Sequence, residues 1–164
     1  MSRDDAFTAF VAARGPALRR TAYLMTGDWH EAEDLTQTAL AKLYLAWPRV
    51  TSDGAEAYAR RIVARAFIDA RRRLWRREQP TEQLPDRPGP VDRVEERLDL
   101  AQALAKLSPS HRAVLVLRFW EDMSLEQVAD VLSLSSGTVK SQTSRALERV
   151  RTLMGADTVL VGTE

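Results

Sequence analysis

The stretch SLEQVADVLSLSSGTVKSQTSRALERV, residues 124–150, indicates the fold more clearly than any other part of the chain. It predicts a short helix over 125–132 and a second helix over 136–153, because apolar residues recur at three- and four-residue spacings. Ser124 followed by Gln127 has the spacing of a capping box, which marks the start of the first helix. Two helices joined by so tight a connection are typical of a helix-turn-helix.

The second of these helices divides into an apolar and a polar stripe. Val139, Ala146 and Val150 share the apolar stripe, which is expected to pack on the preceding helices. In a helix-turn-helix, the second helix enters the major groove N-terminus first, so its polar stripe would reach base edges and phosphates. A helical hairpin with an ordinary solvated face is the alternative interpretation. The candidates for DNA contact are Thr138, Lys140, Ser141, Ser144 and Arg145.

Another helix is predicted over 109–120, just before this motif. Ser108 and Pro109 form the combination of a capping residue followed by proline at the first helical position. The segment is too apolar on most sides to read bases, so we expect it to support the motif. Its two arginines, Arg112 and Arg118, are expected to be available to the DNA backbone.

The first 77 residues are also helical in pattern. Apolar spacing predicts helices over 3–13, 16–26, 29–46 and 54–77, and Asp28 and Asp53 stand at N-cap positions. The helix over 29–46 has a polar stripe that includes Asp34, Gln37 and Thr38. An acidic and amide face within a basic block suits a protein partner better than DNA, and a plain solvated face is the alternative.

The helix over 54–77 is dominated by arginine. Residues 60–77 contain eight arginines against one acidic residue, Asp69. Arginine at this density is typical of phosphate binding, and the aromatic residues beside it offer stacking surfaces for unpaired bases. Ile62, Phe67 and Tyr58 are nevertheless more suited to the core, because a helix in a small bundle needs an apolar stripe. The candidates for DNA contact in this helix are Arg60, Arg61, Arg65, Arg72, Arg73 and Arg76.

Composition and charge divide the chain into two blocks. The chain has 164 residues and a net charge of +1, but residues 1–77 carry +5 (14 basic, 9 acidic) and residues 78–99 carry −4 (3 basic, 7 acidic). Four of the seven prolines lie at 80, 85, 88 and 90, where they prevent a continuous helix. We therefore predict an all-α fold with two small helical domains, 1–77 and 94–154, joined by a flexible Pro-rich linker, 78–93. A helix over 92–106 leads into the second domain, and 155–164 forms a short tail.

Several classes of protein are disfavoured. The absence of cysteine excludes disulfide scaffolds and thiolate zinc sites, and the two histidines, His30 and His111, are too far apart to suggest a metal cluster. No glycine-rich phosphate-binding motif occurs. We expect no enzyme activity, no metal and no cofactor. No apolar run approaches the length of a membrane span, so a cytoplasmic location is expected.

Two classes of function remain open from the residues alone. The chain could be a DNA-binding protein, such as a free-standing helix-turn-helix repressor or activator whose first block senses a signal or dimerises. It could also be a helical module that binds only proteins. The two classes differ in whether the polar stripe at Lys140 contacts DNA.

Two sequence motifs resemble one protein family. Residues 32–37, AEDLTQ, are similar to the region 2.2 motif of the extracytoplasmic-function (ECF) class of bacterial RNA polymerase sigma factors. Residues 107–141 resemble region 4 of the same family through LSP, the arginines at 112 and 118, SLEQVA and GTVKS, in that order. The resemblance covers about residues 5–154. It implies a non-enzymatic factor that binds core RNA polymerase and promoter DNA and promotes melting.

The resemblance also implies residue roles. Asp34 and Gln37, with Thr38 beside them, would dock on the clamp helices of the polymerase β′ subunit, and the arginine helix with the loop before it would read and help melt the minus-10 element. The stripe from Thr138 to Arg145 would read the minus-35 element. Implied partners are the β′ and β subunits and promoter DNA, with an anti-sigma factor as a further candidate. The sequence departs from the family at two positions: Arg65 replaces a frequent Asn, and Gln142 replaces a frequent Arg.

Overall fold

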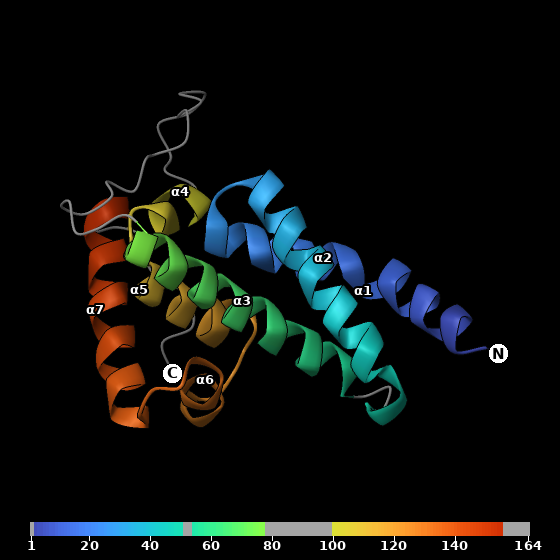
Figure 1. Ribbon diagram of the computed structural model, residues 1–164. Helices are drawn as coiled ribbons and strands as arrows, with labels where there is room; N and C mark the ends of the chain where they lie inside the picture. The colour runs from blue at the N-terminus through green and yellow to red at the C-terminus, as the bar shows by residue number, and fades with distance from the viewer. Residues whose placement is uncertain (1, 51–53, 78–99, 156–164) are drawn as a thin grey trace.

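The computed structural model of the chain describes residues 2–50, 54–77 and 100–155, without the side chains of 75–77. Those residues form seven α-helices and two short irregular helices and contain no strand (Figure 1), which confirms the all-α prediction. The predicted linker, 78–93, and the tail beyond residue 155 lie outside the described residues. Within the described ranges, no helix combines the length and apolarity needed to cross a bilayer.

The first helix group contains α1 (Arg3–Thr26), α2 (Trp29–Ala46), the 3₁₀ helix η1 (Trp47–Arg49) and α3 (Ala55–Arg77). Gly27 ends α1 in the left-handed region at φ 72°, where glycine carries no steric penalty. Asp28 then caps α2 by accepting hydrogen bonds from the amides of His30 and Glu31 at 2.7 and 3.2 Å. The predicted cap Asp53 lies outside the described residues.

A break in the first helix was wrongly predicted. Separate helices were predicted over 3–13 and 16–26, but α1 runs through Gly15 and Pro16 without interruption. A proline removes the amide that would bond the carbonyl four residues earlier, here that of Ala12. Ala12 and Pro16 are both exposed, so water can hydrate that carbonyl. Packing of apolar side chains on both sides of Pro16 supplies the rest of the helix stability.

The second helix group contains α4 (Leu100–Ala105), α5 (Pro109–Leu115), the π-helix η2 (Val116–Trp120), α6 (Leu125–Leu132) and α7 (Ser136–Met154). Ser108 caps α5, and Ser124 with Gln127 forms the full capping box at α6, as predicted. Ser133 ends α6 in the left-handed region at φ 55°, and Ser135 caps α7 two residues later. These caps create the short turn of the helix-turn-helix.

The last turn of the helix predicted over 109–120 is wider than expected. Residues Val116–Trp120 form a π-helix, and the amide of Glu121 donates to the carbonyl of Val116 at 3.0 Å. Asp122 follows with a positive φ of 53°. This wide turn directs the end of the segment toward α1, where the Thr21 hydroxyl donates to the Glu121 carboxylate.

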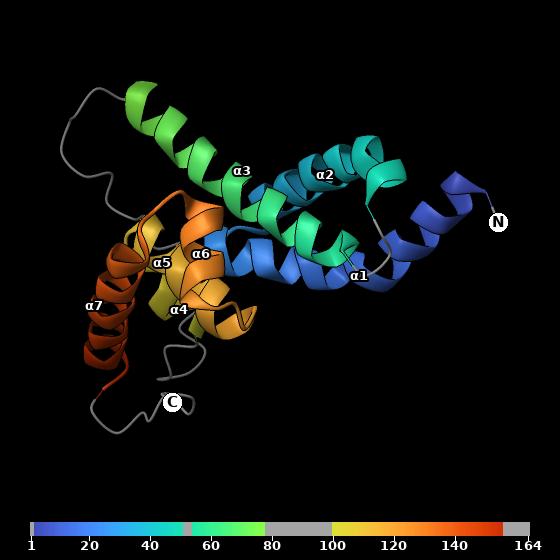
Figure 2. The same cartoon turned by 90° about the horizontal axis from the view of Figure 1, so that it is seen from below.

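The two helix groups pack against each other through one continuous apolar core. Met25 and Phe67 of the first group and Val114 and Leu117 of the second are all completely buried in it. Helix α3 crosses α6 and α5, and α1 contacts α4, α5 and η2, as Figures 1 and 2 show from two directions. A second, smaller core near the start of α1 contains Leu18 and Leu43.

Candidate nucleic-acid interface

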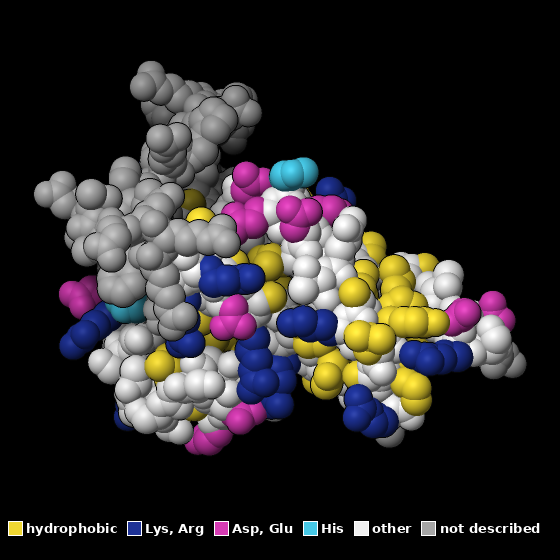
Figure 3. All heavy atoms as spheres, in the orientation of Figure 1, with side chains coloured by type: hydrophobic (Ala, Val, Ile, Leu, Met, Phe, Trp, Pro, Cys, Tyr) yellow, Lys and Arg dark blue, Asp and Glu magenta, His cyan; other side chains and the backbone are white. Residues whose placement is uncertain are grey.

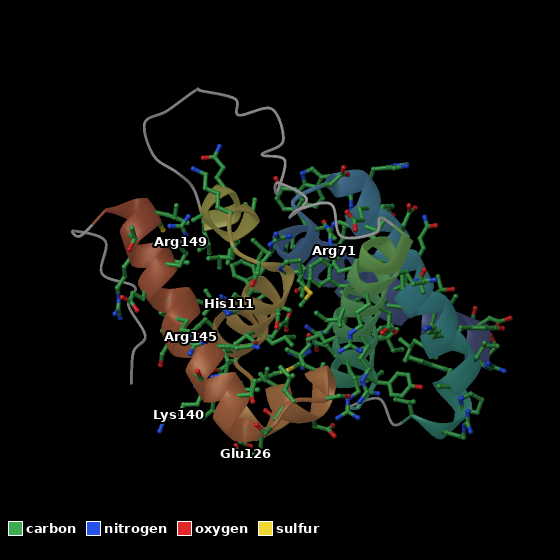
Figure 4. The ribbon with its side chains drawn as sticks, turned by 60° about the vertical axis from the view of Figure 1, so that its left-hand side comes forward. Arg71, His111, Glu126, Lys140, Arg145 and Arg149 are labelled. Carbon is green, nitrogen blue, oxygen red and sulfur yellow. The ribbon has the colours of Figure 1, made fainter. Side chains whose placement is uncertain are left out.

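Helix α7 presents the predicted polar stripe to solvent. Val139, Ala146 and Val150 are at most 1% exposed, so one side of the helix is fixed against α5 and α6. Figure 4 shows Lys140, Arg145 and Arg149 in sequence along the helix. The predicted DNA contacts are all exposed: Thr138, Lys140, Ser141, Ser144 and Arg145. A helix anchored by its apolar side and cationic on the other has the geometry needed to enter a major groove.

Gln142, one of the two departures from the family pattern, faces the other way. Its Oε1 accepts a hydrogen bond of 2.9 Å from the Ser110 hydroxyl on α5, and its side chain is half-buried. Gln142 therefore fixes α7 on α5 and lies away from the stripe that faces DNA in our interpretation.

His111 also lies between α5 and α7, close to Arg145 (Figure 4). Burial, with a smaller contribution from the Arg145 charge, lowers the pKa of His111 below its ordinary value of 6.5. Both effects disfavour the charged form of this imidazole, which lies beside one of the candidate DNA contacts.

Arg112 was wrongly predicted to contact the DNA backbone. It is only 3% exposed, and its guanidinium donates to backbone carbonyls at 2.6–3.3 Å. Those carbonyls belong to Met25, Leu104, Ala105 and Leu107. A buried guanidinium needs such acceptors, and the apolar run that follows it, residues 113–117, was the sequence signal for burial.

Arg118 has a structural contact of its own. One of its terminal nitrogens donates to the Met123 carbonyl at 2.6 Å, which fixes the turn between η2 and α6. Its side chain is half-buried, and its Nε is buried without a hydrogen-bond partner among the described residues. Contact of Arg118 with DNA stays a prediction.

Helix α2 exposes its polar stripe. Asp34, Gln37 and Thr38 all face solvent. Leu35 and Ala39, on the opposite stripe, are 7% and 0% exposed and pack in the main core. The structure therefore brings the three predicted polymerase contacts together on one accessible face.

The arginines of α3 divide into two sets. Arg60, Arg61 and Arg65 bond to the second helix group, although Arg65 is itself exposed. Arg72 and Arg73 are exposed further along the helix. The side chain of Arg76 lies outside the described residues. Figure 3 shows Lys and Arg side chains gathered around α3, with acidic side chains next to them.

Two acidic residues that the sequence did not single out are the partners of the first set. Arg60 bonds the Glu121 carboxylate at 2.9 Å, and Arg61 bonds the Asp130 carboxylate. Arg65 donates to the carbonyls of Asp130 and Val131 at 3.4 and 3.2 Å, at the C-terminal end of α6. No local sequence pattern could reveal these pairs, because Arg60 and Arg61 lie 61 and 69 residues away from their partners along the chain.

Comparison with known proteins places both helix groups in one family. The model for Sigma-70 region 2 matches residues 10–77, and the model for Sigma-70 region 4 matches residues 103–152. The RNA polymerase sigma-E factor of Streptomyces coelicolor is 42% identical over 153 residues, which span 88% of this chain and 84% of that protein. The ECF RNA polymerase sigma factor SigL of Mycobacterium tuberculosis is 34% identical over 148 residues, or 82% and 80% of the two chains.

Solved structures agree with this placement. The sigma factor RpoE, in complex with the anti-sigma factor NepR from Bartonella quintana, has a TM-score of 0.70 and 26% identity, over 93% of this chain and 99% of that chain. CnrH, in complex with the cytosolic domain of CnrY, has a TM-score of 0.62 and 25% identity, over 94% and 91%. Sigma factors act in transcription initiation and are not enzymes, as the sequence predicted for this chain. The chain belongs to the ECF class of RNA polymerase sigma factors, with region 2 in its first helix group and region 4 in its second.

Proposed function

We propose that this sigma factor docks on the β′ clamp helices of core RNA polymerase through the α2 face of Asp34, Gln37 and Thr38. Region 4 reads the minus-35 element through α7 and lies near the β subunit. Region 2 reads the minus-10 element through α3 and promotes melting there. Each domain alone has a small DNA-contacting surface, and tethering both to polymerase raises their effective concentration at the promoter.

The observation that carries this proposal is the pair of oppositely constructed helix faces. Helix α7 exposes a cationic stripe that includes Lys140 and Arg145, and α2 exposes an acidic and amide stripe that includes Asp34. Each stripe lies opposite a buried apolar one. A cationic helix suits phosphates and guanine edges, whereas the acidic one repels them and suits a protein partner.

The minus-10 assignment rests on the chemistry of α3. Arg60, Arg61, Arg65, Arg72, Arg73 and Arg76 supply charge for the phosphates of a melted strand. Tyr58 is 39% exposed on the same helix and offers a ring for stacking, whereas Phe67 is fully buried. Region 2 therefore combines the two properties that single-stranded DNA binding requires.

An anti-sigma factor is a further proposed partner. Both solved structures named above are complexes with a regulatory chain, NepR or the cytosolic domain of CnrY. We extend this to the present chain together with a cytoplasmic location, where polymerase and promoter DNA are found.

Polymerase binding is tested with the double variant Asp34→Arg/Gln37→Arg. We expect its affinity for core polymerase, measured by pull-down and by fluorescence anisotropy, to fall about tenfold or more, because two cations replace the acidic and amide contacts. A matched control, Thr8→Arg/Ala12→Arg/Ala13→Arg, adds the same charge at exposed positions of α1. Unchanged affinity in the double variant, or an equal loss in the control, would refute the assigned face.

A further inference from the structure

A side-chain hydrogen bond joins helix α7 to α5 inside their apolar contact. The Ser110 hydroxyl on α5 donates to Oε1 of Gln142 on α7 at 2.9 Å, and both side chains are half-buried. Gln142 follows Val139 by three residues and precedes Ala146 by four, so the three side chains lie toward the same side of the helix. Val139 and Ala146 are each 0% exposed. A polar side chain therefore stands within the row of residues through which α7 packs on the rest of region 4.

A hydrogen bond restrains a helix in a way that apolar packing does not. Apolar burial depends on area and has no preferred direction, so it permits a small rotation of α7 about its own axis. The bond between Ser110 and Gln142 requires a short distance and a favourable angle, so the same rotation would break it. Polar residues placed in apolar helix contacts fix helix register in this way. The bond can therefore select one rotation of α7 among several that bury the same apolar stripe.

This hydrogen bond lies at the turn of α7 that carries most of the candidate minus-35 contacts. Ser141, Ser144 and Arg145 all lie within three residues of Gln142, and all three are exposed. His111, the residue after the donor of the bond on α5, lies close to Arg145 (Figure 4). The first turn of α5 thus supports the turn of α7 from which these three side chains project. A rotation of α7 at this point would displace all of them relative to the base edges of a bound duplex.

We propose that Ser110 and Gln142 are positioning residues for the sequence preference of region 4, because their hydrogen bond holds α7 in the rotation that presents Ser141, Ser144 and Arg145 to the minus-35 bases. The inference rests on the proposed reading of the minus-35 element by α7. Neither residue needs to touch DNA for this role, since Gln142 bonds to α5 and Ser110 belongs to α5. Loss of the bond lowers discrimination between bases more than it lowers phosphate binding, because phosphate contacts carry no sequence information.

The first test measures base preference in the holoenzyme, assembled from core polymerase and the full chain. The holoenzyme selects duplexes from a library randomised at the minus-35 and minus-10 elements, and sequencing gives the preference at each position. For Ser110→Ala we expect discrimination at the minus-35 element to fall about two- to tenfold, which is the range that one net hydrogen bond can supply. The minus-10 preference is the internal reference and is expected to match wild type. An unchanged minus-35 preference in Ser110→Ala overturns the proposal.

Further variants separate positioning from direct contact with DNA. Ser110→Thr keeps the hydroxyl and is expected to keep the wild-type preference. Gln142→Leu, alone or combined with Ser110→Ala, is expected to lower discrimination no further than Ser110→Ala does, because each change removes the same bond. A changed preference in Gln142→Leu with none in Ser110→Ala would show that Gln142 contacts a base itself, and would contradict the positioning role.

Thr143→Val is the matched control within α7. Its hydroxyl donates to the Val139 carbonyl of the same helix at 2.6 Å, so the change removes a hydrogen bond of a half-buried side chain without altering the contact with α5. We expect Thr143→Val to keep the wild-type preference. An equal loss of discrimination in this control would show that any weakening of α7 has the same effect, and would overturn the specific role of Ser110 and Gln142.

Two other outcomes are informative. If Ser110→Ala lowers the melting temperature and the occupancy of all duplexes alike, with the ratio between bases unchanged, the bond is only structural and the proposal is wrong. A wild-type holoenzyme that shows a preference at the minus-10 element and none at the minus-35 element would instead contradict the proposed function of α7. The failure of the positioning role and the failure of the proposed function are therefore distinguishable.

Discussion

Arg112 shows how one residue type serves opposite purposes in this protein. The α3 arginines that we assign to DNA lie at the surface or at the contact between regions 2 and 4, whereas Arg112 is buried and bridges four backbone carbonyls. One of these, at Met25, belongs to region 2, and the others hold the segment between α4 and α5. Its guanidinium therefore stabilises region 4 and the domain contact together.

The Arg112→Leu variant is expected to lose about 2–4 kcal/mol of unfolding free energy, because buried carbonyls lose their donors. Urea denaturation followed by circular dichroism measures the loss. Arg149→Leu, at an exposed position of α7, is the control and is expected to stay within about 0.5 kcal/mol of wild type. Similar stabilities for the two variants would show that the carbonyl contacts contribute little.

His111 gives region 4 a predictable response to pH. The folded protein holds the pKa of His111 below its ordinary value of 6.5, so the unfolded chain takes up the proton first as pH falls. The stability linked to His111 is present above the unfolded value and declines as pH falls below it. Thermal unfolding from about pH 7.5 to about pH 5.5 should show a smaller decline for His111→Gln than for wild type. Identical declines would exclude His111 as a source of this dependence.

At the scale of elements, local chemistry predicted most helices but not their irregularities. The predicted bounds of α2, α6 and α7 agree with the structure within one residue, because caps and apolar stripes act locally. The break at Pro16 was wrong, since packing on both sides outweighed one missing hydrogen bond. The π-helix at Val116–Trp120 was not predictable either, because no local residue pattern requires it and it positions Glu121 against a distant helix.

The same contrast holds for the candidate sites. The α2 and α7 faces follow from spacing within one helix, so the sequence predicted which residues share them. The burial of Arg112 and the partners of Arg60 and Arg61 depend on contacts between regions 2 and 4. Such contacts arise from the packing of two domains and leave no periodic pattern in either one.

Helix α7 is expected to carry the sequence preference of region 4. Lys140→Ala/Arg145→Ala should weaken binding to duplexes selected by the wild-type chain by about 1–3 kcal/mol for each base-contacting side chain removed. The double variant should also discriminate less between selected and scrambled duplexes. Arg149→Ala/Arg151→Ala removes the same charge near the other end of the helix. This control is expected to weaken binding without changing which duplexes are preferred. Anisotropy titrations against selected and scrambled duplexes separate the two effects, and a retained preference in Lys140→Ala/Arg145→Ala would contradict the α7 assignment.

At the scale of the whole molecule, a net charge of +1 conceals a strongly divided chain. Arg60, Arg61 and Arg65 of region 2 bond carboxylates and carbonyls of region 4. The apolar core around Met25 and Phe67 adds to this contact between the two regions. In the proposed function, polymerase would hold the two regions at separate promoter elements.

In vitro transcription by core polymerase with this chain, on a library of genomic fragments, tests the proposed role in initiation without an intermediate step. We predict discrete transcripts that depend on the chain and start downstream of two shared sequence elements. Asp34→Arg/Gln37→Arg should abolish those transcripts. Sequence-specific binding to DNA without any transcript from core polymerase would contradict this role and would instead indicate a free-standing helix-turn-helix regulator.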